Sequence, residues 1–509
     1  MPVQVDPNNV RLNLKSNNQE HLLSFHDKLT ENEKSSLLSQ INSLEFSRIA
    51  QIYKNATSNS SLTSSGTIEP LSNDSFASTI YESDQTQHEF ANKIKDWEKL
   101  GLTLIRNNKV AVLLLAGGQG TRLGSSAPKG CYDIGLPSHK SLFQLQAERI
   151  KRLELLTQSI EELSDHPHPV TIPWYVMTSG PTKAETINFF ERHNFFGLKK
   201  DQIIFFEQGV LPCLTNDGKI MLEDKSKVAK APDGNGGVYR ALAKEGVLDD
   251  MRKRGIIHVH MYCVDNCLVR VADPVFIGYC ASKEAECGSQ VVRKTNPAEP
   301  VGILCKRNGK FQVVEYSEID KETTEKRDSK GQLLFRAANI ANHYYRTNFL
   351  EKIAKEIEPK MEYHIARKKI PTVCLIQYLT TGELIKPTTP NGMKLELFVF
   401  DVFPFTEKLA VLEVAREDYF SPLKNAPGTN EDSPETSRRD IMNQHRRFLE
   451  AAGAHVRPDA NGECTVEISS LVSYAGENLH RLSGLYLQCP IIINNEEDLE
   501  ILIKNSKGK

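Results

Sequence analysis

Residues 110–124 of the chain read VAVLLLAGGQGTRLG, an apolar run that leads directly into a glycine-rich segment. Six consecutive apolar residues, 110–115, are typical of a strand that is buried on both faces of a parallel sheet. Clustered glycines allow the backbone to approach a ligand closely, and their N–H groups can form a concavity that binds anions. A glycine-rich turn with no ligand is the alternative for this segment.

Segments that follow this stretch continue the alternation of strand and helix. Apolar runs occur at 175–178, 203–207 and 256–264, and they are separated by helical patterns at 141–156 and 183–192. This alternation predicts a doubly wound α/β domain. Ligands in such domains lie beyond the carboxyl ends of the strands, here the loops after Leu115, Glu207 and Val264.

Antiparallel strands are expected in the same sheet, which makes it a mixed sheet. The sequence Arg307-Asn-Gly-Lys310 is typical of a type I′ hairpin turn. Residues 394–403 predict a further strand with a partly alternating pattern.

The chain is expected to have three parts. Residues 1–105 are polar and mainly helical, with capping-box spacing at Thr30–Glu33 and again at Thr86–Glu89. Residues 106–420 form the predicted catalytic α/β domain that binds the nucleotide and the sugar. Residues 421–509 form a small β-rich C-terminal domain, with a mobile loop expected at 425–439 and strands at 464–468 and 490–493.

Composition excludes several classes of protein. The chain has 509 residues, and its 63 Lys and Arg nearly balance its 65 Asp and Glu. Nucleic-acid binders usually carry a basic excess, so no nucleic-acid partner is expected. No apolar run approaches the length of a membrane span. The ten cysteines form no CxxC pair, which indicates reduced thiols and a cytoplasmic location.

Two cations suggest what the glycine segment binds. The spacing of Gly118, Gly120 and Gly124 matches neither the Walker A loop nor the GxGxxG dinucleotide motif. Arg122 and Lys129 lie in or next to the same loop, where an anion such as phosphate would neutralise them. The loop is therefore predicted to bind phosphate groups.

The segment LAGGQGTRLGSSAPKGCYDIGLPS at 115–138 resembles the nucleotide loop of eukaryotic UDP-N-acetylglucosamine pyrophosphorylases, the UDPGP type 1 family. Further segments carry the same resemblance in order along the chain: 207–209, 211–213, 231–237, 264–266, 314–316, 339–343, 391–403, 421–425 and 473–477. The resemblance implies a Rossmann-like, GT-A-like nucleotidyltransferase. Such an enzyme joins UTP to N-acetylglucosamine 1-phosphate with Mg²⁺ and releases pyrophosphate.

The resemblance also implies roles for residues around the nucleotide. The uracil would be contacted by the backbone of four consecutive residues, Leu115, Ala116, Gly117 and Gly118. Gln208 and Gly234 would read the edge of the base. Arg122, Lys129 and Lys394 would act on the phosphates and stabilise charge as pyrophosphate leaves.

The expected metal ligands are two aspartates. Asp265 follows an apolar strand, where a carboxylate could bind the nucleotide and hold Mg²⁺ against the α-phosphate. Asp401 ends another apolar run and is the candidate second carboxylate. An ordinary cap at the end of a strand is the alternative for Asp265.

The resemblance assigns the sugar phosphate to seven positions: Asn235, Glu315, Tyr316, Asn339, Phe398, Phe400 and Lys424. Amide and carboxylate groups suit sugar hydroxyls and an acetamido group. Phe398 and Phe400 could wall the acetyl methyl group, or one of them could simply pack in the core. Lys424, on a loop that could close over the substrate, would bind phosphate.

Several alternatives stay open. The enzyme could also use N-acetylgalactosamine 1-phosphate, or it could be a related pyrophosphorylase for glucose or galactose 1-phosphate. A catalytically silent nucleotide-sugar sensor is the alternative from another class, and intact Arg122, Lys129 and Asp265 argue against it. A homodimer is left open. An apolar insertion at 374–379 departs from the family pattern without a physical explanation.

Overall fold

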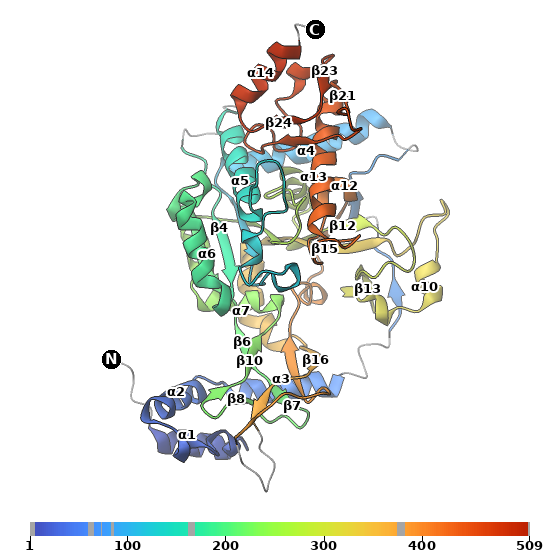
Figure 1. Cartoon of the computed structure of the whole chain (residues 1–509). Helices are drawn as coiled ribbons and strands as arrows, with labels where there is room; N and C mark the ends of the chain where they lie inside the picture. The colour runs from blue at the N-terminus through green and yellow to red at the C-terminus, as the bar shows by residue number, and fades with distance from the viewer. Residues whose placement is uncertain are drawn as a thin grey trace. The chain divides into compact units, whose positions relative to one another are not determined.

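The computed structural model describes residues 6–59, 66–72, 74–82, 86–160, 168–373 and 382–506. It has two compact units, each built from separate segments (Figure 1). The smaller unit comprises Met1–Thr67, Gln208–Ala241 and Glu356–Asp401, and the larger unit comprises the rest. The predicted division at 105 and 420 stays a prediction. The apolar insertion at 374–379 lies outside the described residues.

The larger unit is organised around an 11-stranded mixed sheet, counted over the described residues. Its main path runs β2 (Phe76–Ser78), β20 (Leu409–Val414), β12 (Cys287–Arg293), β15 (Ala337–Arg346), β11 (His258–Cys263), β3 (Val110–Leu115), β4 (Trp174–Thr178), β5 (Ile203–Glu207). Only β15 on this path is antiparallel to its neighbours. The predicted α/β class and the predicted apolar strands are confirmed.

The predicted hairpin is also confirmed. Strands β13 (Ile303–Arg307) and β14 (Lys310–Val314) pair antiparallel, with Arg307 opposite Lys310. Asn308 and Gly309, which connect them, have φ angles of 52° and 75°, as a type I′ turn requires. The short strand β1 (Ile68–Glu69) pairs with β13, and β13 pairs with β15, so the hairpin is joined to the central sheet.

Helices cover the sheet because its strands are apolar on both faces. Val110, Val112 and Leu114 share one core with α5 (Leu142–Gln158) and α6 (Gly180–Arg192). Tyr175 on β4 points to the other face, where its hydroxyl donates to Asp250 of α8 (Val247–Lys253) at 2.8 Å. Packing on both faces of the sheet therefore fixes the position of β3, which leads directly into the glycine segment.

Two helices of the larger unit cross at very short range. In α4 (Gln87–Arg106), a Cβ on Gly101 would lie 1.9 Å from the Pro274 carbonyl oxygen. In α9 (Pro274–Ser282), a Cβ on Gly278 would lie 1.8 Å from the Trp97 carbonyl oxygen.

The expected capping box at Thr86 is wrong, because the Thr86 side chain makes no cap hydrogen bond although α4 begins next to it.

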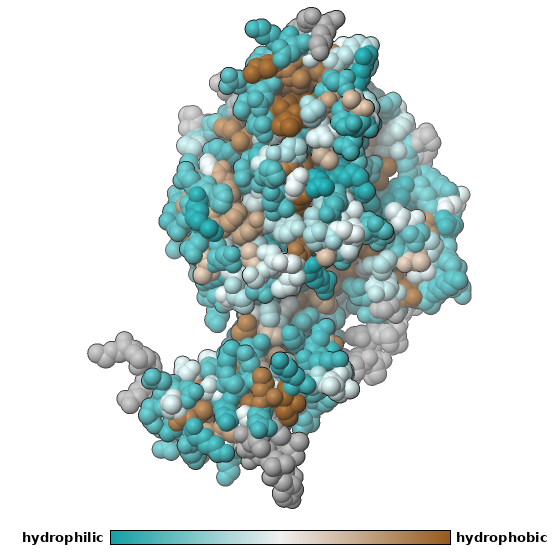
Figure 2. Space-filling model, in the orientation of Figure 1, coloured by the Kyte–Doolittle hydropathy of each residue, from teal (hydrophilic) through white to brown (hydrophobic). Residues whose placement is uncertain are grey.

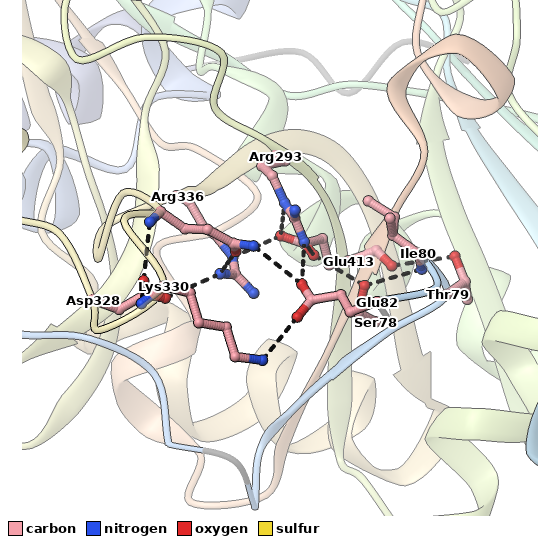
Figure 3. Close-up of polar contacts among 10 residues, drawn as sticks. Ser78, Thr79, Ile80, Glu82, Arg293, Asp328, Lys330, Arg336 and Glu413 are labelled. Atoms are coloured by element: carbon pink, nitrogen blue, oxygen red, sulfur yellow. Dashed lines mark hydrogen bonds and ion pairs between the residues drawn. The ribbon is translucent and has the colours of Figure 1, made fainter. Parts of the chain in front are cut away.

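A buried carboxylate connects the neighbouring strands β20 and β12. Glu413 on β20 is fully buried and accepts from Arg293 of β12 at 2.6 Å and from Arg336 at 3.0 Å (Figure 3). Glu82 accepts from the same Arg293 side chain at 3.0 Å and pairs with Lys330 at 3.2 Å. Because the carboxylates and guanidiniums compensate each other, these charges can be buried in the sheet.

The C-terminal part of the larger unit has its own apolar core. Its elements are α12 (Arg416–Tyr419), α13 (Pro434–Ala451), β21 (His455–Arg457), β22 (Val466–Ile468), β23 (Tyr486–Gln488), β24 (Ile491–Ile493) and α14 (Glu496–Ser506). The loop expected at 425–439 is shorter, because Ser433 caps α13 and the helix begins at Pro434. Figure 2 shows apolar patches on this part, where Leu471, Tyr486, Ile492 and Ile501 are exposed.

The remaining elements of the larger unit are short. They are α10 (Lys321–Glu325), α11 (Thr347–Lys352) and a π-helical turn at Ile353–Ile357 whose last two residues belong to the smaller unit. Helix α7 (Val238–Lys244) begins in the smaller unit and ends in the larger one.

The smaller unit combines N-terminal helices with short antiparallel pairs. The helices are α1 (Pro7–Ser16), α2 (Glu31–Asn42) and α3 (Phe46–Asn59), and the predicted Thr30–Glu33 capping box is confirmed at α2. The strand pairs are β19 (Gly392–Glu396) with both β16 (His364–Lys368) and β7 (Leu214–Thr215), β6 (Val210–Pro212) with β10 (Lys230–Pro232), β8 (Leu222–Asp224) with β9 (Lys227–Val228), and β17 (Thr372–Val373) with β18 (Leu384–Ile385). The strand predicted at 394–403 is wrong in extent. It ends at Glu396, and the chain then turns into a 3-10 helix at Phe403–Phe405.

Candidate active site

The carboxyl ends of β3 and β11 bring two of the predicted loops together in the larger unit. These strands are parallel neighbours, with Cys263 opposite Leu115, and the Val264 N–H donates to the Leu115 carbonyl at 3.2 Å. Asp265 therefore follows β11 beside the start of the glycine segment. The loop after Glu207 leads into the smaller unit.

The glycine segment forms a closed loop whose base carries Lys129. The Lys129 N–H donates to the Gly118 carbonyl at 3.2 Å, and Gln119 is bridged antiparallel to Pro128. The Lys129 Nζ lies 3.5 Å from a carboxylate oxygen of Asp265. Lys129 is thus brought next to Asp265, as phosphate binding and metal binding at one place require.

Arg122 lies at the tip of this loop rather than at its base. It belongs to a 3-10 turn, Thr121–Leu123, which ends at Gly124 with a φ of 77°. Its side chain is exposed and makes no hydrogen bond or ion pair within the described ranges. A guanidinium presented in this way can bind an anionic ligand without first breaking a protein contact.

Of the four positions where the resemblance places the uracil, Gly118 is the one with open space beside it. Leu115 and Ala116 are buried, and the Ala116 N–H donates to the Met177 carbonyl at 2.8 Å. A Cβ on Gly118 would meet no atom within 4 Å. The Ser179 hydroxyl donates to the Gly117 carbonyl at 2.7 Å and fixes the start of the loop. Ser179 was not predicted, although its position directly after β4 is a signal that sequence reasoning could have used.

Lys424 joins the same site through the backbone of its neighbour. The Leu423 N–H donates to the Asp265 carbonyl at 2.9 Å, and the Lys424 side chain is exposed. Burial raises the pKa of the Cys263 thiol to about 12, and the Asp265 charge adds to this shift. Lys424 and Lys129 lower the pKa of the Cys263 thiol in part, because each cation favours the charged thiolate. The larger unit therefore brings Lys129, Asp265 and Lys424 together.

The predicted sugar residues of the larger unit lie around Gly302. The Asn339 N–H donates to the Gly302 carbonyl at 2.9 Å, and a Cβ on Gly302 would lie 3.2 Å from a Glu315 carboxylate oxygen. Asn339 Oδ1 accepts from the Ala341 N–H at 3.1 Å, which leaves the amide nitrogen to donate elsewhere. Tyr316 follows Glu315 and is 52% exposed.

The predicted uracil readers of the smaller unit are in contact. Gln208 Nε2 donates to the Gly234 carbonyl at 2.5 Å, and the same nitrogen lies 3.5 Å from Asp233 Oδ1. With the amide nitrogen directed to these oxygens, Gln208 Oε1 is left to accept from a ligand. Position 234 requires glycine, because its φ is 85° and a Cβ there would lie 2.1 Å from the Leu397 carbonyl oxygen.

Asp233 is a buried carboxylate that sequence reasoning did not single out. Its side chain fits only because Gly209 and Gly237 have no Cβ, which would lie 2.4 Å and 1.9 Å from its oxygens. Burial raises the pKa of Asp233 to about 6, against the hydrogen bond from Gln208, which lowers it. An aspartate among several glycines was the sequence pattern that could have pointed to Asp233.

The remaining predicted residues at the end of β19 form a compact turn. The rings of Phe398 and Phe400 are stacked, with centroids 5.2 Å apart, and the Val399 N–H donates to Asn235 Oδ1 at 3.1 Å. Asp401 accepts from the Phe398 N–H at 2.7 Å and from His364 Nε2 at 3.1 Å. Asn235, Phe398, Phe400 and Asp401 are therefore brought together within the smaller unit.

Lys394 faces a different part of the smaller unit. It lines a pocket of about 1110 Å³ whose wall includes Cys213, Ala229, Lys230 and Ile370. Among the residues that the structure describes, no other predicted site residue lines this pocket. Burial lowers the pKa of Lys230 in this wall.

The donor set around Asp265 fits a magnesium ion that is shared with a substrate. Mg²⁺ usually takes one or two carboxylates together with phosphate oxygens and water. The Asp265 side chain is 26% exposed and pairs with Lys129. No group of three or more His, Cys, Asp or Glu side chains with metal-site geometry occurs in the described segments, so an all-protein metal cage is not seen there. Asp401 keeps fewer free lone pairs, because His364 and the Phe398 N–H use two of them.

Sequence comparison identifies the family to which the chain belongs. The family described as UTP--glucose-1-phosphate uridylyltransferase matches residues 43–451. The chain belongs to this UDPGP family. As a member it is a nucleotidyltransferase, and the predicted family and enzyme class are confirmed.

Relatives of the UDPGP family align with nearly the whole chain. The UDP-N-acetylhexosamine pyrophosphorylase-like protein 1 of Xenopus tropicalis is 46% identical, covering 91% of each chain. The UDP-N-acetylglucosamine pyrophosphorylase of Saccharomyces cerevisiae is 47% identical over 85% of this chain and 86% of the yeast protein. The crystal structure of the Trypanosoma brucei uridine diphosphate N-acetylglucosamine pyrophosphorylase has a TM-score of 0.80 at 32% identity and covers 96% of this chain and 98% of its own. In the described ranges, every helix is too short or too polar to cross a bilayer.

Proposed function

We propose that the chain is a uridylyltransferase that converts UTP and N-acetyl-α-D-glucosamine 1-phosphate to UDP-N-acetylglucosamine and pyrophosphate. The observation that carries this proposal is the pairing of Lys129 with Asp265 where β3 and β11 end, directly beside the open glycine loop. The named pyrophosphorylases among its relatives support the choice of an N-acetylhexosamine 1-phosphate.

The chemistry needs no general base. A phosphate oxygen of the sugar phosphate attacks the α-phosphorus of UTP, and the bond from that phosphorus to the oxygen bridging to the β-phosphorus breaks. The attacking oxygen is already anionic at neutral pH, so no proton has to be removed. Catalysis then depends on positioning and on stabilising the charge of the transition state and of pyrophosphate.

We assign these roles to residues of the larger unit. Lys129 neutralises charge near Asp265, Arg122 binds the outer phosphates, and Lys424 binds the phosphate of the sugar. Asp265 would hold Mg²⁺, which supplies Lewis-acid stabilisation of the phosphate oxygens when bound. In the smaller unit, Asp401 is the proposed second carboxylate, and Lys394 is a proposed phosphate-binding residue.

The base and the sugar are assigned to the residues that the family resemblance gives for them. Gln208 Oε1, Gly234 and the backbone of residues 115–118 would read the uracil. Glu315, Tyr316, Asn339 and Asn235 would bind the sugar hydroxyls and the acetamido group, and the stacked Phe398 and Phe400 rings would contact the acetyl methyl group.

N-acetylgalactosamine 1-phosphate is a second candidate substrate, because the name of the Xenopus relative specifies N-acetylhexosamine. Pyrophosphate release is measured with UTP, Mg²⁺ and a panel of sugar 1-phosphates. Faster turnover of the N-acetylated sugars than of glucose 1-phosphate is expected. Equal rates would refute the acetamido assignment, and no turnover of any sugar would favour a nucleotide-sugar sensor. A cytoplasmic location and a homodimer stay predictions. Cell fractionation tests the location, and light scattering tests the homodimer.

A further inference from the structure

Lys129 and Asp265 form a loose ion pair where β3 and β11 end. The Lys129 Nζ lies 3.5 Å from a carboxylate oxygen of Asp265, whereas a charge-assisted hydrogen bond of this kind is about 2.7–2.9 Å long. The two side chains are 16% and 26% exposed, so an ion from solvent can reach both. Among the described residues, the Asp265 carboxylate makes no other hydrogen bond or ion pair. The pair can therefore open without breaking another described contact of this carboxylate.

The backbone on both sides of the pair is fixed. Next to Lys129, a Cβ on Gly130 would lie 2.2 Å from the Phe143 ring, so this part of the loop is packed tightly. The Asp265 carbonyl accepts from the Leu423 N–H at 2.9 Å. Any opening of the pair is therefore a rotation of side chains, and the flexible four-carbon stem of lysine allows the ammonium to move.

A divalent ion at Asp265 would compete with the Lys129 ammonium. Mg²⁺ takes carboxylate oxygens directly, and it repels an ammonium a few ångströms away. An ammonium that leaves Asp265 needs another anionic partner. The glycine loop that carries Lys129 is predicted to bind phosphate, so phosphate oxygens of a nucleotide can supply that partner.

We propose that Lys129 is a placeholder for the metal. It neutralises Asp265 in the ligand-free chain and moves to the phosphates of the nucleotide when Mg²⁺ binds Asp265. The inference rests on the proposed function, because it assumes that a metal and a nucleotide share this edge of the sheet. The exchange couples the two ligands: each binds more tightly in the presence of the other, and by the same factor.

The first measurement is binding of Mn²⁺, as a substitute for Mg²⁺, to the purified full chain without nucleotide. The electron spin resonance of free Mn²⁺ gives the affinity. Lys129→Met removes the ammonium and keeps most of the side-chain length. We expect it to tighten Mn²⁺ binding by about 3–10-fold, because it removes the repulsion and the need to open a half-buried pair. Lys129→Arg keeps a cation and should bind Mn²⁺ like wild type. Lys200→Met, at an exposed pair with Glu191, is the matched control and should also bind like wild type.

The second measurement is UTP affinity, by calorimetry, with EDTA and with saturating Mg²⁺. In EDTA, Lys129 stays paired with Asp265, so Lys129→Met should change UTP affinity little. With Mg²⁺ the same substitution should weaken UTP binding by about 3–10-fold, because the ammonium is then on the phosphates. Asp265→Asn frees Lys129 without a metal and should bind UTP more tightly than wild type in EDTA.

Unchanged or weaker Mn²⁺ binding by Lys129→Met would overturn the exchange, and so would an equal loss of UTP affinity with and without Mg²⁺. Wild-type Mn²⁺ affinity in Asp265→Asn would also overturn it, because the metal would then bind elsewhere. Absence of turnover with every sugar 1-phosphate would refute the proposed function, while the two binding measurements still decide the exchange. Melting curves show whether each variant is folded, and Lys129→Gln replaces Lys129→Met if the latter does not fold.

Discussion

Lys129 Nζ lies 3.5 Å from a carboxylate oxygen of Asp265, although 136 positions separate the two residues along the chain. The pairing exists because β3 and β11 are parallel neighbours whose carboxyl ends coincide. A cation and a metal-competent carboxylate are thus held at one edge of the sheet before any substrate binds, which is the arrangement that phosphoryl-type transfers need.

Removing the cations should reduce turnover more than affinity for UTP. We expect Lys129→Ala to lower kcat by about 10²–10³-fold, because one preorganised charge at the transition state contributes on this scale. Arg122→Ala should act in the same direction. Steady-state pyrophosphate release and equilibrium UTP binding are the measurements. Lys200→Ala removes an exposed pair with Glu191 and is the matched control. Unchanged kcat in the Lys129 variant would remove that residue from the mechanism.

Asp265→Asn should raise the Mg²⁺ concentration needed for half-maximal rate by about tenfold or more, because it removes a charged ligand. Asp401→Asn should raise it less, because His364 and the Phe398 N–H already occupy this carboxylate. Magnesium titrations of initial rate measure both shifts. The same curve for wild type and Asp265→Asn would show that the metal binds elsewhere.

Asn339→Ala should weaken the preference for the acetamido sugar. We expect the ratio of kcat/KM for N-acetylglucosamine 1-phosphate over glucose 1-phosphate to fall by about 10–100-fold, as for loss of one buried polar partner. Rates with both sugars and a melting curve are compared, since Asn339 also accepts from the Ala341 N–H. A proportional loss with both sugars would assign Asn339 to the scaffold instead.

Asp233 should make the stability of the smaller unit depend on pH. Its pKa is about 6 in the folded chain, raised by burial from an ordinary value of 3.8, so the folded state holds the proton more tightly. The stabilisation is complete below about pH 4 and is lost as pH rises to about 6, by roughly 3 kcal/mol. Within the part of the chain that the structure describes, Arg48, Glu358 and Tyr363 are charged or titratable groups that act on it.

The Asp233→Asn variant should lack this pH-dependent contribution to the unfolding free energy. Urea unfolding of both proteins between pH 4 and 7 measures the difference in unfolding free energy, which should move in favour of the asparagine variant as pH rises. A difference that stays constant over this range would show that Asp233 does not titrate there.

Gly278→Ala should destabilise the larger unit by about 2–5 kcal/mol, because the new Cβ would lie 1.8 Å from the Trp97 carbonyl oxygen and force α4 and α9 apart. Gly118→Ala is the matched control, since its Cβ meets no atom within 4 Å. It should melt like wild type and lose UTP affinity. Equal melting temperatures for Gly278→Ala and wild type would contradict the close crossing.

Local patterns in the sequence were enough for the elements with strong periodicity or turn chemistry. The buried strand at 110–115 has the predicted bounds, because an unbroken apolar run of strand length is stable in a parallel sheet that is covered on both faces. The turn at Asn308-Gly309 needs positive φ at both positions, which these two residues tolerate best. The predicted capping box at Thr86 and the predicted strand after Glu396 were wrong, because the local sequence at both places is compatible with more than one structure.

By itself the sequence determined the α/β class, the glycine loop with its two cations, and the family to which they belong, because these depend on residues close together in the chain. Only the tertiary structure decided that Lys129 meets Asp265 while Arg122 stays at the loop tip. It also decided that Asp233 is buried between glycines. The reason is physical: such contacts depend on which strands become neighbours and in what register, and no local spacing encodes that choice.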